Sequence, residues 1–151
     1  MRTLVLGIGS PIKCDDAIGL RVLSELSTMK LEGVDLEEAC CSGLDLIEIM
    51  IDYDRVILID AILDSGHPPG TVMELGVEAF EDTVHGGNPH EANIATTIEL
   101  GKRLAPDRFP RVFHFVAVEV NDVETVSDEM TPEIEAVIPE AVETVLRLIR
   151  T

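Results

Sequence analysis

The sequence predicts an α/β fold in three layers (α/β/α), with helices covering both faces of a mainly parallel, twisted sheet of about five strands. Apolar runs of strand length alternate along the chain with segments of helical period. One run, residues 55–61, contains Val-Ile-Leu-Ile, which is typical of a central strand covered on both faces. Such an alternation indicates a sheet built from strand–helix–strand units.

The first half of the chain is predicted to form three strands and two helices. Residues 3–9 are an apolar run closed by Gly-Ser-Pro, which indicates a buried strand followed by a turn. A helix should begin near Asp16, because apolar residues then recur at three- and four-residue steps and share one face: Ile18, Val22, Leu26 and Met29. Residues 34–41 are predicted as a strand and residues 43–51 as a short apolar helix, and the central strand at 55–61 follows.

The second half is predicted to add two strands and two helices. An extra strand is expected at residues 71–77, and a further strand at 111–120. The helix between them has a clear start signal, formed by a candidate cap, a proline at the first helical position and an acid at capping-box spacing: Asn88, Pro89 and Glu91. A final helix opens at Thr131-Pro132, and Pro139 inside it is expected to kink it. No repeat or linker interrupts the chain, so residues 1–151 are predicted as a single domain.

Composition and charge exclude several classes of function. Hydrophobic residues make up 46% of the chain, which is too many for a disordered protein. The 11 basic and 29 acidic residues give a net charge of −18, so nucleic acid and anionic membrane surfaces are not expected as partners. The three cysteines are not expected to form a disulfide framework, and neither a signal peptide nor a membrane-spanning run is expected. A cytoplasmic location is therefore expected.

Candidate functional residues follow the predicted strands, where ligands bind in open parallel sheets. Asp60 ends an apolar run, so its carboxylate needs a partner, either a loop amide or a ligand. Asp15 and Asp16 open a helix, where only one of them can serve as the N-cap. His90 falls in the first turn of its helix, whose positive end favours the neutral imidazole that binds metals. Taken singly, each residue also fits an ordinary structural role.

Taken together, Asp16, Asp60 and His90 are predicted to form a cation site. One imidazole with two carboxylates suits a borderline divalent ion such as nickel, zinc, manganese or iron, and residue type alone does not choose among them. His85 is a possible accessory ligand. The adjacent Cys40 and Cys41 are too close together for the usual chelating spacing and are interpreted as buried thiols.

Three other features carry weaker signals. His114 lies inside an apolar run and is interpreted as a sheet residue, and His67 lies in a Pro/Gly turn and is interpreted as solvated. Gly7-Ile8-Gly9 resembles the start of a dinucleotide-binding fingerprint, but Ile12 stands at the third glycine position.

The motifs in combination resemble the hydrogenase maturation proteases, which trim the large subunit of nickel–iron hydrogenases. Gly7-Ile8-Gly9 followed by Asp15-Asp16 and Gly19 resembles the opening motif of that family. The strand ending in Asp60-Ala61, the pair His90-Glu91 and the helix start at Thr131-Pro132 resemble its later motifs. Ser10, Ala17 and residues 39–43 depart from the family pattern, and the last of these leaves the choice of substrate open. A branch serving a coenzyme F420-reducing hydrogenase is one explanation of that departure.

The resemblance implies a phosphorylase/hydrolase-like fold and an endopeptidase whose partner is the precursor of a nickel–iron hydrogenase large subunit. It implies that Asp16, Asp60 and His90 bind nickel already held by the precursor, and that the C-terminal extension is then removed. The three ligands are expected to position the substrate, while the metal polarises the carbonyl or activates water, or a free carboxylate such as Asp15 acts as general base.

Two rival functions remain open at this stage. A receiver-like signalling domain would use Asp60 as phosphoacceptor, although here several residues separate the acid pair from the first strand and no lysine follows residues 111–120. A dinucleotide-binding oxidoreductase is the other alternative.

Overall fold

The structure, a computed structural model, describes the backbone of residues 1–39, 44–77 and 89–151, and the side chains of residues 89–93 lie outside this description. Within the described residues, five strands form one sheet in the order β2-β1-β3-β5-β4. The parallel strands are β1 (Thr3–Ile8), β2 (Val34–Ala39), β3 (Arg55–Ile62) and β5 (Val112–Glu119). The edge strand β4 (Val72–Leu75) runs antiparallel to β5. The predicted mainly parallel sheet is confirmed.

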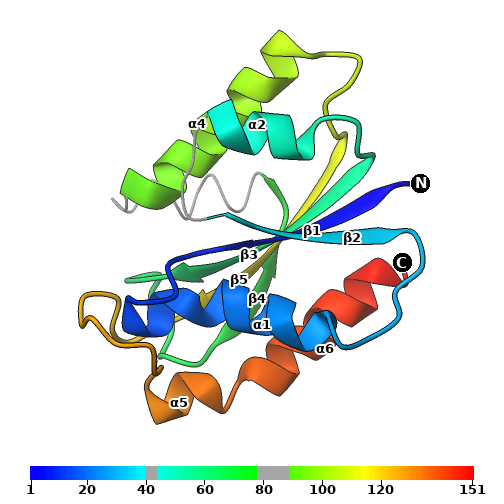
Figure 1. Cartoon of the computed structure of the whole chain (residues 1–151). Coiled ribbons are helices and arrows are strands. Elements are labelled where there is room, and N and C mark those ends of the chain that lie inside the picture. The colour runs from blue at the N-terminus through cyan, green and yellow to red at the C-terminus, as the bar shows by residue number, and fades with distance from the viewer. Residues whose placement is uncertain (40–43, 78–88) are drawn as a thin grey trace.

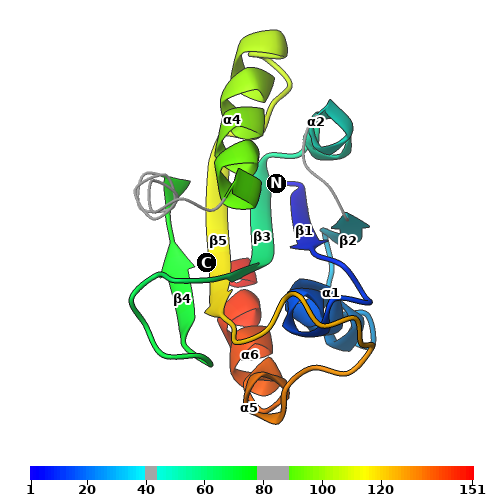
Figure 2. The ribbon, with the colours of Figure 1, turned by 90° about the vertical axis from the view of Figure 1, so that its left-hand side faces the viewer.

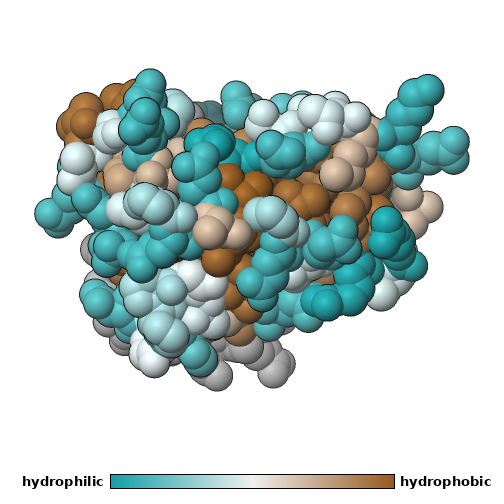
Figure 3. All heavy atoms as spheres, turned by 90° about the horizontal axis from the view of Figure 1, so that it is seen from below, coloured by the Kyte–Doolittle hydropathy of each residue, from teal (hydrophilic) through white to brown (hydrophobic). Residues whose placement is uncertain are grey.

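Helices cover both faces of this sheet, as predicted (Figure 1). One face carries α2 (Leu44–Met50) and α4 (Pro89–Leu104). The other carries the 3-10 helix η1 (Cys14–Ala17) with α1 (Ile18–Leu26), and the C-terminal helices α5 (Pro132–Glu135) and α6 (Ile138–Ile149). Seen from the side of α1, α5 and α6, polar side chains cover much of the surface, and apolar atoms show in the middle of this face and in a group at one end (Figure 3). No helix in the described part of the chain is long and apolar enough to cross a membrane.

Two hydrophobic cores lie on the two sides of the sheet, because side chains alternate along each strand. Ile57 and Ile59 of β3 belong to the core under α1 and α6. Val56 and Leu58 belong to the core under α2 and α4. The next residue in the second series is Asp60, so strand alternation places it on the face that α2 and α4 cover.

Two predicted helices differ in detail from the structure. The chain after Gly9 does not enter an α-helix near Asp16 but first forms η1, and Met29 lies beyond α1 and is 40% exposed. The C-terminal helix is divided rather than kinked, since α5 ends before Pro139 and α6 starts at the residue preceding it. Proline has no N–H to donate to the previous turn but is tolerated in the first turn of a new helix.

Candidate functional site at the carboxyl edge of the sheet

Three segments that are distant in sequence meet at the edge where the parallel strands end. Figure 2 looks onto this edge, and with Figure 1 it shows η1 after β1, the end of β3 and the start of α4 on the same side of the molecule. The predicted residues Asp16, Asp60 and His90 lie on these three segments in turn. The backbone thus brings the three predicted positions to one edge.

Glycines allow η1 and α1 to lie directly against the strands. A Cβ atom on Gly9, whose φ is +156°, would lie 2.0 Å from the Asp16 carbonyl oxygen. One on Gly19 would lie 2.5 Å from the Ile59 carbonyl oxygen. These glycines of the opening motif therefore set how close the acid pair comes to β1 and β3, and this contact explains their presence without a bound dinucleotide.

Asp16 presents a half-buried carboxylate to the carboxyl edge. Its Oδ2 accepts a hydrogen bond from the Ser10 N–H at 3.0 Å, which fixes the orientation of the group. The expectation that one acid of the pair caps the helix is wrong, because Lys13 occupies the N-cap position of η1 without a side-chain cap bond. The Asp16 side chain reaches back to the preceding turn instead.

Asp15 is fully buried and holds the β5–α5 loop, residues 120–131. Its Oδ2 accepts the N–H groups of Asn121 and Asp122 at 3.1 and 2.9 Å. Its Oδ1 accepts the N–H and the hydroxyl of Thr131 at 2.8 and 2.9 Å. Asp15 is therefore not a free carboxylate, since both of its oxygens accept hydrogen bonds from this loop.

Asp60 is 3% exposed and lies two residues before the end of β3. Its Oδ1 accepts the N–H of Ala61 at 2.9 Å. A carboxylate at this depth is costly unless its charge is compensated. One oxygen of Asp60 therefore hydrogen-bonds a backbone amide, that of the next residue in β3 rather than of a loop.

His90 is the second residue of α4, and the helix starts at Pro89 as predicted. Its side chain, like His85, Cys40 and Cys41, lies outside the described residues. Within the described part of the chain no group of three or more His, Cys, Asp or Glu side chains is placed to hold a metal ion. A three-ligand site here therefore needs a side chain from outside the described residues, and His90 is the predicted one.

The remaining thiol and histidines take no part in this cluster. Burial raises the pKa of the Cys14 thiol, and the neighbouring carboxylates of Asp15 and Asp122 raise it further, so Cys14 is not a thiolate at neutral pH. His114 is a partly buried residue of β5, as expected. His67 is exposed in the loop between β3 and β4, also as expected.

Glu119 is a functional candidate to which the sequence analysis gave no role in the site, although the acidic strand end Val118-Glu119-Val120 is part of the family resemblance. It ends β5, is 3% exposed, and its Oε1 accepts both the N–H and the hydroxyl of Ser65. It lines a cavity of about 480 Å³ with Asp64, His67 and Asn121, beyond the ends of β3 and β5. The signal was an acid directly after an apolar strand, the same signal that identified Asp60.

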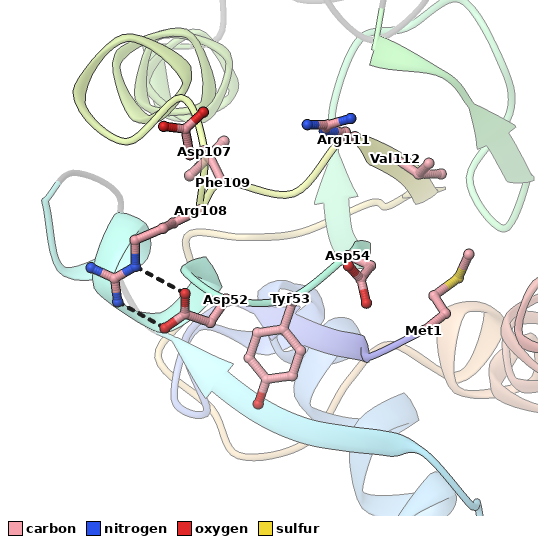
Figure 4. Close-up of a pocket in the computed structure, with 9 residues that line it drawn as sticks. All are labelled: Met1, Asp52, Tyr53, Asp54, Asp107, Arg108, Phe109, Arg111 and Val112. Carbon is pink, nitrogen blue, oxygen red and sulfur yellow. Dashed lines mark hydrogen bonds and ion pairs between the residues drawn. The ribbon is translucent and has the colours of Figure 1, made fainter.

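A second hollow, of about 470 Å³, lies at the opposite edge of the sheet, where β3 and β5 begin (Figure 4). Arg108 binds Asp52 there through two bonds of 2.9 and 2.8 Å, which compensate the two charges. No predicted site residue lines this hollow, so the carboxyl edge remains the candidate active site.

Comparison with known proteins identifies the chain. The family model described as hydrogenase maturation protease matches residues 20–148. The hydrogenase 2 maturation protease of Escherichia coli K12 is 30% identical, over 99% of this chain and 92% of its own. Among solved structures, the E. coli hydrogenase maturating endopeptidase HybD superposes with a TM-score of 0.88 at 30% identity, covering 99% of this chain and 93% of that one. The Thermococcus kodakarensis [NiFe] hydrogenase maturation protease HybD shares the fold, with a TM-score of 0.82 at 24% identity and 99% of both chains covered.

The fold and these relatives define an α/β peptidase. More specifically, the chain belongs to the hydrogenase maturation protease family. The resemblance drawn from the motifs is confirmed.

Proposed function

We propose that this endopeptidase removes the C-terminal extension of a nickel–iron hydrogenase large-subunit precursor and acts on the precursor that already carries nickel. The membership of the family supports the reaction class. One geometric observation carries the metal-reading part: Asp16, Asp60 and the first turn of α4 converge on one edge of the sheet although they are far apart in sequence. The nickel is part of the substrate in this proposal.

The donor set fits such a task. Two carboxylates with one imidazole suit a borderline divalent ion, and they leave coordination positions for ligands that belong to the precursor. Asp16 is oriented by the Ser10 N–H, and Asp60 by the Ala61 N–H, so hydrogen bonds hold both carboxylates in fixed orientations. A bound divalent ion can polarise the scissile carbonyl or lower the pKa of a water molecule. The three side chains hold and orient the loaded precursor, and cleavage is thereby restricted to it.

The test is incubation of the chain with a large-subunit precursor, with and without nickel, followed by mass spectrometry of the released peptide. Release only from the loaded precursor is the expected result. Asp16→Asn, Asp60→Asn and His90→Gln should each lower kcat/KM at least about 100-fold, because each removes a charge or ligand from the metal-reading set. Asp107→Asn, an exposed acid at the opposite edge, is the matched control and should cleave normally.

Two outcomes would contradict the proposal. Equal cleavage of nickel-loaded and nickel-free precursor would show that the metal is not read. Wild-type rates of cleavage by Asp16→Asn would show that the Asp16 carboxylate is not needed in the mechanism.

We place the reaction in the cytoplasm, as the cysteine pattern predicts, and fractionation of the native host tests that part.

The receiver-like alternative is less well supported. The doubly wound receivers have five parallel strands in the order 2-1-3-4-5. Here β5 lies beside β3, and the edge strand β4 is antiparallel. Incubation with acetyl phosphate and Mg²⁺ tests the alternative, and we expect no stable phosphate on Asp60.

A further inference from the structure

Two loops are joined beside the candidate site and present two exposed apolar side chains. The Ser127 N–H donates to the Ile12 carbonyl at 2.9 Å, and the Cys14 N–H donates to the Ser127 carbonyl at 3.1 Å. Lys13 and Ser127 thereby form a parallel β-bridge. The register places the residue before each bridge partner side by side, and these residues are Ile12 and Val126. Figures 1 and 2 both show the two loops next to each other at the carboxyl edge.

Both side chains are unusually open to solvent. Ile12 is 57% exposed and Val126 is 79% exposed, although the hydrophobic effect favours burying them. A single exposed apolar residue needs no explanation, but two neighbours on separate loops form a patch. We define Ile12 and Val126 as the rim patch. Asp16 follows Ile12 by four residues, so the patch and the candidate site share the segment that links β1 to η1.

The rim patch is held rigidly before any partner arrives. Asp15 binds both ends of the β5–α5 loop, through Asn121 and Asp122 at one end and Thr131 at the other. Asp122 Oδ1 accepts the N–H groups of Glu124 and Thr125, each at 2.9 Å, and so closes the turn before Val126. A surface that is already ordered loses little conformational entropy on binding, which favours a docking function.

The charges around the patch indicate the chemistry of its partner. The same loop exposes three acids, Glu124, Asp128 and Glu129. The only neighbouring base on the bridged segments is Lys13. A partner that covers the patch must therefore combine apolar side chains with basic ones, because a like-charged partner would be repelled.

We infer that the rim patch is a docking surface for the hydrogenase precursor, and that it receives an exposed segment in which apolar side chains are flanked by basic ones. This inference rests on the proposed function, since the occupant is the precursor that the site cleaves. Contacts of this kind act before and during cleavage alike, so they contribute to KM and leave kcat unchanged.

The experiment measures KM and kcat for the nickel-loaded precursor that the wild-type chain cleaves. In the double variant Ile12→Ser/Val126→Ser, KM should rise about tenfold while kcat stays within about twofold, because the apolar contacts are lost without a change of charge. Leu104→Ser is the matched control, since Leu104 is 61% exposed at the far end of α4, and its KM should not change. Thermal midpoints of all variants establish that they are folded.

A second arm tests the charge complementarity. Glu124→Gln/Glu129→Gln should raise KM about threefold to tenfold and reduce its dependence on ionic strength. Glu32→Gln, an exposed acid in the loop before β2, is the control and should leave both quantities unchanged.

The outcomes separate the two proposals. Unchanged KM in Ile12→Ser/Val126→Ser, beside a wild-type chain that cleaves, overturns the docking inference and leaves the proposed function standing. A rise in KM equal to that of Leu104→Ser also overturns it. Failure of the wild-type chain to cleave any loaded precursor overturns the proposed function and the inference together.

Discussion

Asp15 and Asp16 are neighbours with the same chemistry and different roles, and the difference comes from what surrounds them. Asp15 points inward and is fully buried among N–H and hydroxyl donors of the β5–α5 loop. Asp16 is half-buried, and its carboxylate accepts a hydrogen bond from the Ser10 N–H. Asp15 is therefore a residue that positions the loop, whereas Asp16 can face a substrate.

This division predicts that two isosteric substitutions affect different properties, stability in one case and precursor processing in the other. Asp15→Asn should lower the free energy of unfolding by about 2–4 kcal/mol, because an amide nitrogen cannot accept the N–H groups of a buried loop. Asp16→Asn should change that free energy by less than about 1 kcal/mol while it abolishes processing. Urea denaturation followed by circular dichroism provides the first quantity and the precursor assay the second. Equal losses of stability in both variants would contradict the division.

The sequence predicted the acid pair as part of the candidate site, but it did not indicate how the roles of Asp15 and Asp16 differ. The donors that commit Asp15 lie more than 100 positions away, so no local pattern reveals them. Asp60 was identifiable because it ends an apolar run. Glu119 carries the same signal, but its partner Ser65 belongs to a turn whose path depends on the fold. Gly7-Ile8-Gly9 resembled the start of a dinucleotide-binding fingerprint. The close contact of Gly9 with η1 explains this glycine without a bound dinucleotide.

At the scale of elements, a buried arginine side chain from β3 donates hydrogen bonds to the carbonyls at the end of α6. Arg55, the first residue of β3, is 6% exposed and donates to the carbonyls of Leu148 and Ile149 at 2.9 and 3.0 Å. The last carbonyls of a helix have no partners within it and carry partial negative charge. The guanidinium satisfies two of them and ties α6 to the sheet.

Arg55→Met should therefore lower the free energy of unfolding by about 1–3 kcal/mol, since it removes the guanidinium donor from the Ile149 carbonyl and one of several donors from the Leu148 carbonyl, which Thr151 also contacts. Arg150→Met, at an exposed position after α6, is the control and should change it by less than about 0.5 kcal/mol. Guanidinium denaturation measures both. An Arg55→Met protein as stable as the control would show that the buried charge costs as much as its hydrogen bonds contribute.

His114 in β5 makes stability depend on pH in a defined direction. Burial lowers the pKa of His114, the Arg55 guanidinium lowers it further, and Glu74 partly opposes both. Below its ordinary pKa of 6.5, the unfolded chain therefore binds a proton more readily than the folded chain. Stability from this group is present above 6.5 and is lost as pH falls from there toward the lower folded pKa.

We expect the free energy of unfolding to fall between pH 7.5 and 5.5, and to fall less in His114→Gln, which cannot titrate. Urea denaturation at several pH values measures both slopes. His67→Gln is the control, because His67 is exposed, and its slope should match that of the wild-type chain. Identical slopes in His114→Gln and the wild-type chain would refute the assignment.

Most helices and strands were predictable, because the sequence of a buried parallel strand is a continuous run of apolar residues. The ends of β1 and β3 each fall within one residue of the predicted ranges. The interruption between α5 and α6 was not predicted. One helix kinked at Pro139 and two helices separated before Pro139 would have the same pattern of apolar residues, so the sequence does not distinguish them. The start of η1 was also missed, because its geometry is set by contact with β1 and β3 rather than by local propensity.

At the scale of the molecule, topology brings the site together. Parallel strands all end at one edge, so an acid after β1, an acid near the end of β3 and a helix that starts beside them meet without any local sequence relation. That rule predicted the edge from the sequence. The position of β5 between β3 and β4, which places Glu119 beside the end of β3, could not be read from the order of the elements.

The net charge of −18 is the other property of the whole molecule. The ion pairs in the described part of the chain, such as Arg147–Glu74 and Arg108–Asp52, join exposed side chains and contribute little to stability. The excess of acids repels itself in the folded state more than in the expanded unfolded chain. Repulsion among many charges should therefore outweigh attraction within a few exposed pairs.

Salt should consequently stabilise this protein. Raising NaCl from about 0.01 to about 0.1 M shortens the screening length from about 30 to about 10 Å, which weakens the long-range repulsion before ion-specific effects become large. We expect the thermal midpoint to rise by about 2–6 °C at pH 7.5, measured by calorimetry. Near the sequence pI of about 4.3 the excess charge is neutralised, so the rise should disappear there. A midpoint that falls with salt at pH 7.5 would mean that the exposed ion pairs, rather than the net charge, dominate the electrostatics of the fold.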